Sequence, residues 1–313
     1  MKTILILFNG KSLNAPQIHS LGYNALYNYF AKNNIELCRA PISHYNPQKN
    51  DFKEAQFFIN NEWIIKTNIV PDMVYDKSKY AISIPEKQTR KLIENNNVFY
   101  NSLQLSKLLS DKLLTFNSFK QFSATTVLLT NVSDIQKIKQ LNTSRIIIKP
   151  LSKSGGEGIY ITQKTTAETD IIKNDSFPIL AQDFIDSSTV NNSFVKGCHD
   201  IRVIIRNNTP FYVFARIPQK GKFIANVSQG ASLNVIPIQD LLNDPTVHRF
   251  IHAIMKSVNK LNTTKKLYAI DFMFDNDNNL WLIEMNSRPG LILEKSETSY
   301  QSEFYKNLLK FFK

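Results

Sequence analysis

The sequence is poor in cysteine and glycine and has no long apolar run. Its 313 residues include two cysteines, Cys38 and Cys198, which leave little room for a disulfide framework or a cysteine-rich zinc site and favour a reducing, cytoplasmic location. Nine glycines and twelve prolines exclude collagen-like and low-complexity architectures. The first apolar run, at residues 4–8, is too short for a signal peptide or a spanning helix, so we expect a buried strand there and no membrane partner.

Charge of one sign does not gather in any part of the chain. There are 38 Lys and Arg residues against 26 Asp and Glu, which gives a formal net charge of +12. Such an excess suggests anionic partners, among them a nucleotide, a phosphate and an acidic peptide or protein, although an ordinary soluble basic surface explains it equally well. Because no block of like charges stands out, we expect no nucleic-acid partner.

The first hundred residues have the pattern of a small α/β domain. An apolar strand over residues 3–8, an amphipathic helix over 16–32 and an extended run over 35–39 predict a βαβ opening. The segment AQFFINNEWIIKT predicts a hairpin that turns at Asn60 and Asn61. Further elements are expected as a strand in PDMVYDK and a polar helix over 86–95.

Past a polar tract at residues 94–97, strands outnumber helices. We expect one helix near 103–115 and an amphipathic helix near 246–261. Extended runs are expected over 145–150, 158–162, 178–186, 200–206, 210–218, 267–274 and 280–286. The chain is therefore predicted to be α/β, with an α+β character in its C-terminal part, and it is long enough for more than one domain.

A glycine-rich loop between two apolar strands is the strongest local signal. In IIIKPLSKSGGEGIYI, Lys149 ends the first strand, and Ser154, Gly155, Gly156 and Gly158 lie in the loop. Glycine permits positive φ and lets backbone N–H groups approach a ligand closely, so the hairpin can close over phosphates. Lys149 can point at the same phosphates. The alternative is an ordinary glycine-rich turn beside a surface lysine.

Two acidic residues lie among apolar ones in consecutive strands. Asp271 and Glu284 occupy LYAIDFMF and LWLIEMN, and Asn286 shares the strand face of Glu284. Acidic side chains in such surroundings must be paired, protonated or bound to a cation. Two carboxylates and an amide oxygen are hard ligands, which suit Mg²⁺ held together with substrate phosphates. The alternative is a hairpin whose polar face happens to be acidic.

Arginines on strands form a third signal. Arg202 and Arg206 lie four apart in DIRVIIR and are expected to share a strand face, and Arg216 lies in FARIPQ, with Asn226 shortly after it. A guanidinium is a preferred donor to carboxylate and phosphate oxygens. Exposed surface charge is the alternative for each arginine taken alone.

Two other patterns fall short of a functional motif. The segment LILFNGKS resembles a phosphate-binding loop, but the glycine that this motif requires five residues before Gly10 is Leu5. Cys198, His199 and Asp200 are adjacent, yet one cysteine and one histidine without partners at ligand spacing favour a structural role.

Taken in order, the segments of residues 101–313 resemble the ATP-grasp superfamily, and within it bacterial glutathione synthetase and the RimK-type glutamate ligases. The matching segments are SDKLLTF, IIIKP, SKSGGEG, AQDFID, HDIRV, FARIPQ, NVSQG, AIDFMF and LIEMNSRPGL. The resemblance implies an ATP-grasp fold preceded by an N-terminal Rossmann-like domain at 1–100, with a central lid subdomain at 101–190 and a C-terminal catalytic and metal-binding subdomain at 191–313.

The resemblance also implies ATP and Mg²⁺ as cofactors, with two metal ions and with Mn²⁺ as a substitute for Mg²⁺. It assigns them to residues in three groups, in addition to the glycine-rich loop. These are Lys112 and Lys149 for the phosphates, Gln182, Asp183, Phe184 and Ile185 for adenine, and Asp271, Glu284 and Asn286 for the metal ions.

For the reaction itself, the resemblance implies roles for four further residues. Arg216 would stabilise the transferred phosphoryl group, Asn226 would lie beside the metal ions, and Arg202 and Arg288 would contact a substrate carboxylate or phosphate. Arg288 stands where many relatives carry a small or apolar residue, and residues 230–232 lack the second glycine common in this group. The identity of the substrate therefore does not carry over.

The reaction implied is the ATP-dependent joining of a carboxylate to an amine through an acyl phosphate, with release of ADP. The expected substrate is an amino acid that is joined to an amino acid, a peptide or a protein end. Closure of amide or ester links on a ribosomal peptide is the alternative. An inactive nucleotide-binding regulator is a third interpretation, against which the intact lysines and metal-site residues argue. The oligomeric state stays open, a homo-oligomer included.

Overall fold

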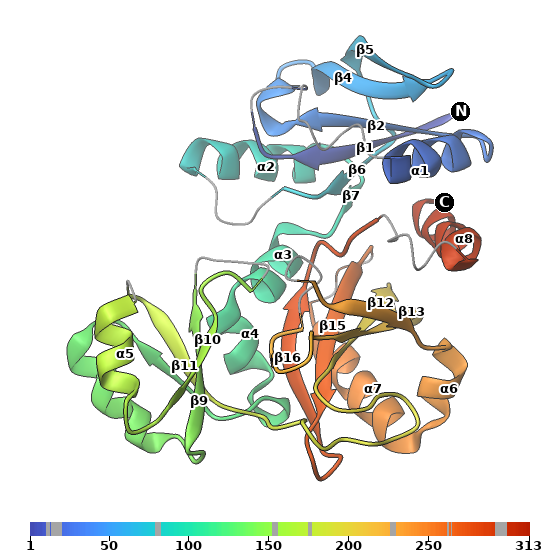
Figure 1. The fold of residues 1–313 in the computed structure, drawn as a ribbon. Helices are drawn as coiled ribbons and strands as arrows, with labels where there is room; N and C mark the ends of the chain where they lie inside the picture. The colour runs from blue at the N-terminus through green and yellow to red at the C-terminus, as the bar shows by residue number, and fades with distance from the viewer. Residues whose placement is uncertain are drawn as a thin grey trace.

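The computed structural model describes residues 1–10, 13, 21–78, 83–151, 156–174, 177–225, 230–261, 263, 265–291 and 299–313. Within them, the chain forms three β-sheets with helices packed against each sheet (Figure 1). Of the residues singled out in the sequence, Ser154, Gly155 and Asn226 lie outside the described ranges, as does the first part of the helix predicted over 16–32. None of the described helices is long and apolar enough to span a membrane.

The first sheet has a parallel centre and an antiparallel edge. β1 pairs in parallel with β2 and β6, whereas β4 pairs with β2 in the antiparallel sense, so the predicted βαβ opening is confirmed. Its strands are β1 (Lys2–Phe8), β2 (Ile35–Pro41), β3 (Tyr45–Asn46), β4 (Asp51–Ile59), β5 (Glu62–Ile69), β6 (Met73–Asp76) and β7 (Phe99–Tyr100), in the order β3-β4-β2-β1-β6-β7 with β5 beside β4.

Alternation along β1 sends successive side chains to opposite faces of this sheet. Ile4 joins a buried cluster with Phe30 of α1 (Leu21–Ala31), whereas Leu5 joins another with Ile93 of α2 (Ile84–Asn96). The two helices therefore cover opposite faces of the sheet, as in a doubly wound α/β domain.

The predicted hairpin is formed by β4 and β5. Asn60 and Asn61 connect them with φ angles of 52° and 65°. A two-residue type I′ turn needs positive φ at both central positions, and asparagine tolerates that conformation better than most residues. The turn therefore follows from the sequence.

The second and third sheets are antiparallel throughout and lie below the first sheet in the view of Figure 1. The second consists of β10 (Tyr160–Gln163), β9 (Arg145–Pro150), β11 (Ile179–Asp183) and β8 (Thr126–Leu129) in spatial order. The third consists of β14 (Ser232–Val235), β13 (Thr209–Ile217), β12 (Asp200–Arg206), β15 (Leu267–Phe274) and β16 (Leu280–Asn286). Each extended run predicted from residue 145 onward overlaps one of these strands, whereas β8 and β14 were not predicted.

The single helix predicted near 103–115 is wrong, because the structure has two. α3 (Leu103–Ser110) ends before Asp111, and α4 (Lys112–Ser118) begins after it. The carboxylate of Asp111 accepts hydrogen bonds from the backbone N–H groups of Leu113 and Leu114, both at 3.0 Å, and so caps α4. The break places Lys112 in the first turn of the second helix.

The remaining helices cover the sheets. They are α5 (Ala167–Asn174), α6 (Ile238–Asn243), α7 (Pro245–Asn259), α8 (Gln301–Phe312) and the 3₁₀ helices η2 (Ile42–His44), η3 (Lys120–Phe122) and η4 (Val132–Gln140). α7 is the predicted amphipathic helix. Asp244 caps its first turn, and its apolar stripe, which includes Val247, Ile251 and Ile254, belongs to the core of the third sheet.

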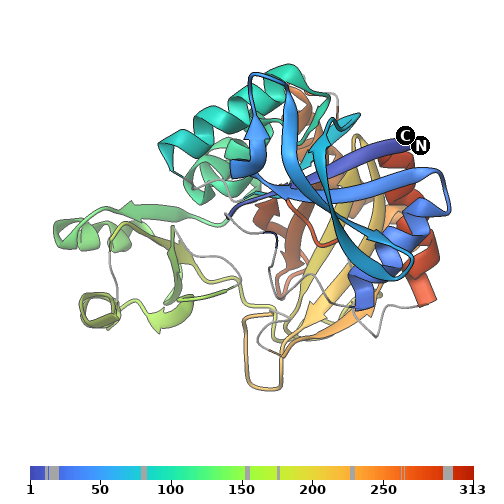
Figure 2. The same cartoon turned by 90° about the horizontal axis from the view of Figure 1, so that it is seen from above.

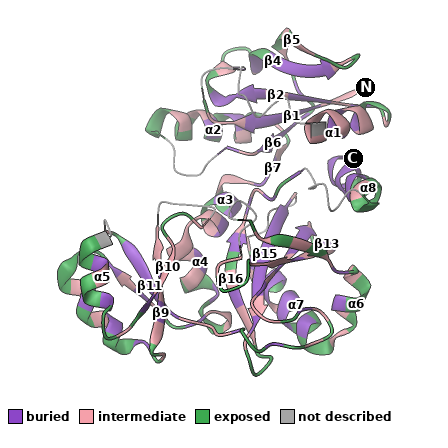
Figure 3. Ribbon diagram, viewed as in Figure 1, coloured by how far each residue is buried: buried purple, intermediate pink, exposed green. Residues whose placement is uncertain are grey.

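The C-terminal helix α8 returns to the N-terminal sheet. The ring centroid of Phe311 lies 4.7 Å from that of Tyr100, and the ring centroid of Phe312 lies 5.5 Å from that of Tyr75. Lys2 Nζ also donates a hydrogen bond to the Phe312 carbonyl at 2.9 Å. The two chain ends consequently lie close together (Figure 2). Figure 3 shows β1, β2 and β15 largely buried. Residues of α8 share one buried cluster with residues of the first and third sheets, so α8 ties these two sheets together.

Candidate active site

A cleft of about 710 Å³ lies between the second and third sheets and is also lined from α3, α4 and the end of β6. It brings together most of the residues singled out in the sequence. These are Lys112, Lys149, Gly156, Gln182, Asp183, Phe184, Ile185, Arg202, Arg216, Glu284, Asn286 and Arg288. Gly158 and Asp271 do not line the cleft, and Arg206 donates from Nη1 to the carbonyl of Asn307 in α8 at 3.1 Å instead of facing it.

Two lysines converge on the cleft from different elements. Lys149 Nζ donates to Gln182 Oε1 at 2.6 Å, and Gln182 is itself held by a bond to Thr126 Oγ1 at 2.7 Å. Lys112 Nζ donates to the carbonyl of Pro150 at 2.6 Å. Burial lowers the pKa of Lys149 to about 8, while the carboxylate of Glu284 opposes that shift. Burial likewise lowers the pKa of Lys112. An anion at this place would be stabilised by two partly desolvated ammonium groups.

At the predicted hinge, at the end of β11, the side chains of Asp183 and Phe184 contact other parts of the protein. Asp183 Oδ1 accepts from the backbone N–H groups of Asn142 and Thr143 at 2.8 and 3.0 Å, so its carboxylate holds that turn. The ring of Phe184 packs edge-on against Phe223, with centroids 5.4 Å apart. A base bound at this hinge would therefore meet backbone groups and apolar surface, whereas the Asp183 carboxylate is already engaged.

Two arginines and two aspartates form a buried network on the third sheet. Arg202 donates from Nε and Nη2 to Asp271 at 2.7 and 2.5 Å. Arg216 donates from Nε and Nη2 to Asp200, both at 2.6 Å, and Nη2 also donates to Asp271 Oδ2 at 2.7 Å. Asp200, Arg202 and Arg216 line the cleft, whereas Asp271 lies beneath them and is 1% exposed.

The charges of this network depend on one another. Burial would raise the pKa of Asp271, but Arg202 and Arg216 hold it below its ordinary value. Burial raises the pKa of Asp200 to about 6, with Arg216 opposing that shift and Asp271 adding to it. Sequence reasoning did not single out Asp200 as a site residue. The signal lies in the pairing of neighbouring strands, because Asp200 lies directly opposite Arg216.

Glu284 and Asn286 present oxygen atoms to the cleft. Glu284 lies opposite Asp271 in the β15–β16 pair, and its side chain is exposed towards the cleft. Asn286 Oδ1 accepts from the backbone N–H of Arg288 at 2.8 Å, which fixes the amide. These are hard oxygen donors that fit Mg²⁺, which proteins usually hold by one or two carboxylates together with substrate phosphates. Among the described residues, no three His, Cys, Asp or Glu side chains are grouped to hold a metal ion.

Asp271 differs from Glu284 as a metal-ligand candidate. Both of its oxygens accept hydrogen bonds from guanidinium groups in this structure. A cation could therefore use Asp271 only if Arg202 or Arg216 gave up one of these bonds, while Glu284 faces the cleft directly.

The residues next to Asp200 have a structural role, as expected from their spacing. The backbone N–H of Phe274 donates to His199 Nε2 at 3.1 Å, and His199 Nδ1 lies 2.8 Å from the carbonyl of Gly197. Both ring nitrogens are thus satisfied when Nδ1 carries the proton, and burial lowers the pKa of the ring. A neutral imidazole with both nitrogens hydrogen-bonded in this way links the loop before β12 to the end of β15.

Two family models match parts of the chain. Residues 111–257 match the ATP-grasp domain of prokaryotic glutathione synthetase, and residues 229–311 match the tubulin-tyrosine ligase family. Glutathione synthetase from Prochlorococcus marinus subsp. pastoris is 28% identical to this chain over 117 residues. That match covers 36% of this chain and 35% of the relative, so the chain spans about a third of the length of the relative.

Solved structures of ligases share the fold over the whole chain. D-alanyl-alanine synthetase A from Vibrio cholerae O1 biovar eltor has a TM-score of 0.62 at 14% identity, with 99% of both chains covered. The Chryseobacterium gregarium RiPP-associated ATP-grasp ligase, in complex with ADP and a leader and core peptide, has a TM-score of 0.61 at 13% identity and covers 100% of this chain and 98% of its own. At such identities the likeness is one of fold, and it confirms the fold predicted from the sequence.

Proposed function

We propose that this chain, which has the ATP-grasp fold and resembles prokaryotic glutathione synthetase, is an ATP-dependent ligase that joins a carboxylate to an amine. The observation that carries the proposal is the composition of the cleft. Lys112, Lys149, Arg202, Arg216 and Glu284 come from five separate elements and line one space. Several convergent cations beside a carboxylate that faces the same space are what phosphoryl transfer from a metal-bound nucleotide needs.

The proposed reaction has two steps. A carboxylate oxygen of the acid attacks the γ-phosphorus of ATP, ADP leaves, and an acyl phosphate results. The amine then attacks the carbonyl carbon, loses a proton, and expels inorganic phosphate. Free carboxylate is a poor electrophile, so the first step supplies the leaving group, and the chain contributes positioning and charge neutralisation.

The residues of the cleft would have separate roles in these steps. Lys112 and Lys149 would bind the phosphates, and the end of β11 would receive adenine. Arg216 would face the transferred phosphoryl group, because its guanidinium is fixed by two carboxylates and still lines the cleft. Glu284 and Asn286, with Asp271 if an arginine yields, would hold Mg²⁺, which when bound neutralises phosphate charge.

Hydroxylamine provides a test that does not require the natural amine. It attacks an acyl phosphate to give a hydroxamate, which forms a coloured complex with Fe³⁺ that is measured by its absorbance. The protein with Mg·ATP, hydroxylamine and pools of amino acids and short peptides should form hydroxamate and ADP in equal amounts, and Glu284→Gln should form neither. ADP release without hydroxamate in every pool would contradict a ligase and would leave nucleotide hydrolysis.

A second candidate is the closure of amide or ester links on a ribosomal peptide. Two observations favour it: the fold is shared with a ligase solved with a leader and core peptide, and the chain carries a formal net charge of +12. The same assay separates the two candidates. Stimulation by a free amino acid supports the first, and stimulation by long acidic peptides alone supports the second.

A further inference from the structure

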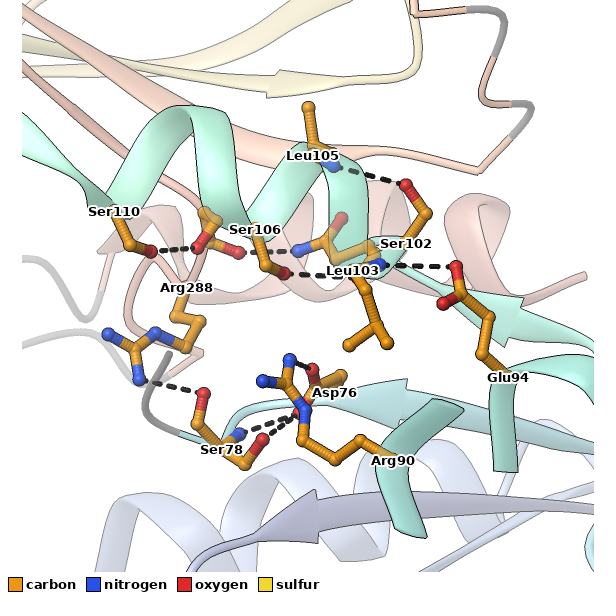
Figure 4. Close-up of polar contacts among 12 residues, drawn as sticks. Asp76, Ser78, Arg90, Glu94, Ser102, Leu103, Leu105, Ser106, Ser110 and Arg288 are labelled. Carbon is orange, nitrogen blue, oxygen red and sulfur yellow. Dashed lines mark hydrogen bonds and ion pairs between the residues drawn. The ribbon is translucent and has the colours of Figure 1, made fainter. Parts of the chain in front are cut away.

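The segments after β6 and after β16 hold each other at one end of the cleft. Lys77 Nζ donates to the carbonyls of Arg288 and Pro289 at 3.0 and 2.5 Å, and Arg288 Nη1 donates to the carbonyl of Ser78 at 2.8 Å. Each segment thus sends a cationic side chain to the backbone of the other, and Figure 4 shows Arg288 reaching Ser78. Lys77 and Arg288 both line the cleft.

These two cations have no carboxylate partner in the described part of the chain. Asp76 lies beside both, but its Oδ1 accepts from the backbone N–H and hydroxyl of Ser78 at 2.8 and 2.5 Å, and its Oδ2 pairs with Arg90. The side chains of Asp76 and Arg90, paired in Figure 4, are each 1% exposed, and neither residue lines the cleft. The charge of Asp76 is therefore already balanced.

The two neighbouring arginines of the cleft, in contrast, are balanced by carboxylates. Arg202 and Arg216 are paired with Asp271 and Asp200. In the described part of the chain, Lys77 and Arg288 are thus two cationic groups at this end that no carboxylate balances. Burial, together with the nearby Arg288 and Arg202, lowers the pKa of Lys77 to about 7. Two cations held close together and partly removed from water raise the free energy of the protein unless an anion binds between them. Such arrangements are typical of binding sites.

We propose that Lys77 and Arg288 form an anion subsite that binds a second anionic group, a carboxylate or a phosphate, of the acid that the enzyme activates. The proposal rests on the proposed function for the role of that acid. Arg288 follows Asn286 by two residues, so the subsite adjoins the place where the first carboxylate would be phosphorylated. An acid with one anionic group would leave these two cations without a partner, and the enzyme would select acids with two.

Binding of a small dianion tests the subsite without turnover. The full chain saturated with Mg·ADP, which fills the nucleotide site, is titrated with malonate and, separately, with inorganic phosphate, and the thermal midpoint is followed. Both Arg288→Gln and Lys77→Gln retain a donor for a backbone carbonyl but lose the charge. Each should weaken malonate binding about 10- to 100-fold, since a charge-assisted hydrogen bond is lost.

Lys164→Gln is the matched control. Lys164 also donates to two backbone carbonyls, those of Lys139 and Leu141, but it lies outside the cleft lining. It should bind both malonate and Mg·ATP as the wild type does. Equal malonate affinity in wild type, Arg288→Gln and Lys77→Gln would overturn the subsite. The two residues would then serve only to join the segments after β6 and after β16.

Turnover then tests the selectivity. Hydroxamate formation is compared within pairs that differ in one anionic group. The pairs are glutamate with glutamine and aspartate with asparagine, as free acids and at the end of a dipeptide, and O-phosphoserine with serine. The charged member should have the lower KM in wild type, and Arg288→Gln should remove the difference. Equal KM values within every pair would overturn the proposal, whereas malonate binding without any hydroxamate would overturn the proposed ligase function and leave the subsite standing.

Discussion

The guanidinium of Arg216 lies between two carboxylates, with its Nη2 2.6 Å from Asp200 Oδ2 and 2.7 Å from Asp271 Oδ2. Burial alone would lower the pKa of Arg216, but Asp271 and Asp200 raise it above its ordinary value. The guanidinium therefore stays protonated, and its hydrogen bonds to the two carboxylates fix its orientation. A preorganised cation of this kind stabilises charge that develops during a reaction, because it needs no reorganisation.

Arg216→Ala should therefore lower kcat much more than it weakens nucleotide binding. We expect nearly normal affinity for Mg·ATP and roughly 100-fold slower hydroxamate formation, the size of effect seen when one transition-state donor is lost. Arg216→Lys should recover little, because an ammonium group cannot donate in parallel to Asp200. Calorimetry and the hydroxamate assay measure the two quantities.

A thermal melt of each Arg216 variant serves as the control for folding, since Asp200 and Asp271 lose a partner. Equal losses of ATP affinity and kcat would make Arg216 a nucleotide-binding residue and would require another group at the acyl phosphate.

Glu284→Gln should abolish most turnover and leave the fold intact. The Glu284 side chain is exposed to the cleft, so the neutral amide fits without strain, but a hard cation loses a charged oxygen ligand. ATP-dependent activity at saturating Mg²⁺ and the thermal midpoint are the measurements. Activity within a few-fold of wild type would show that Glu284 is not a metal ligand.

Nucleotide affinity should fall as pH rises through about 8. Lys149 has a pKa of about 8 because it is buried, and Glu284 limits the shift. The ammonium form that binds phosphate is present below that pKa and is lost above it, so ATP binds more weakly at pH 9 than at pH 7. Lys149→Arg keeps its charge over this range and should bind ATP with a flatter pH profile. Calorimetry at several pH values would refute the assignment if the two profiles had the same slope.

Asn101→Ala should destabilise the fold by about 3 kcal/mol or more. Asn101 is fully buried; its Nδ2 donates to the carbonyls of Leu267 and Ser287 at 2.7 and 2.5 Å, and its Oδ1 accepts from the N–H of Leu267 at 2.7 Å. Removing the amide leaves three buried polar groups without partners. The readout is the free energy of unfolding in urea.

Asn68→Ala is the control for that experiment, because it measures the cost of placing alanine at a positive φ angle without the loss of buried hydrogen bonds. Asn68 has a φ of 54° and is exposed, whereas Asn101 has a φ of 59°. Both variants incur the cost of a left-handed alanine, about 1–2 kcal/mol, but only Asn101→Ala also loses buried hydrogen bonds. Similar losses of stability in the two variants would mean that the Asn101 amide contributes little.

The strands of the third sheet were predictable because their sequence pattern is local. β12, β15 and β16 begin and end at the predicted residues, since apolar alternation and turn residues determine them. Family motifs also led to Lys149 on β9, Arg216 on β13 and Glu284 on β16, which the fold brings to one cleft.

Other features depend on distant parts of the chain and could not be predicted. The helical spacing of apolar residues in α8 is local and was overlooked, whereas the packing of its apolar face on Tyr75 and Tyr100 depends on residues far away in the sequence. The pairing of Asp271 with two arginines required the register of three strands, and the contact of Lys77 with the Arg288 segment required the placement of one sheet against another.

The transfer of oxygen from the acid to phosphate tests the central claim most directly. Amino acids and short acidic peptides with ¹⁸O in their carboxyl groups are incubated with the protein, Mg·ATP and hydroxylamine, and the inorganic phosphate is analysed by mass spectrometry. An acyl phosphate intermediate predicts one ¹⁸O atom in each phosphate released, in an amount equal to the ADP formed. Phosphate that forms together with ADP but takes its fourth oxygen from water, and so carries no ¹⁸O, would contradict carboxylate activation and with it the proposed ligase.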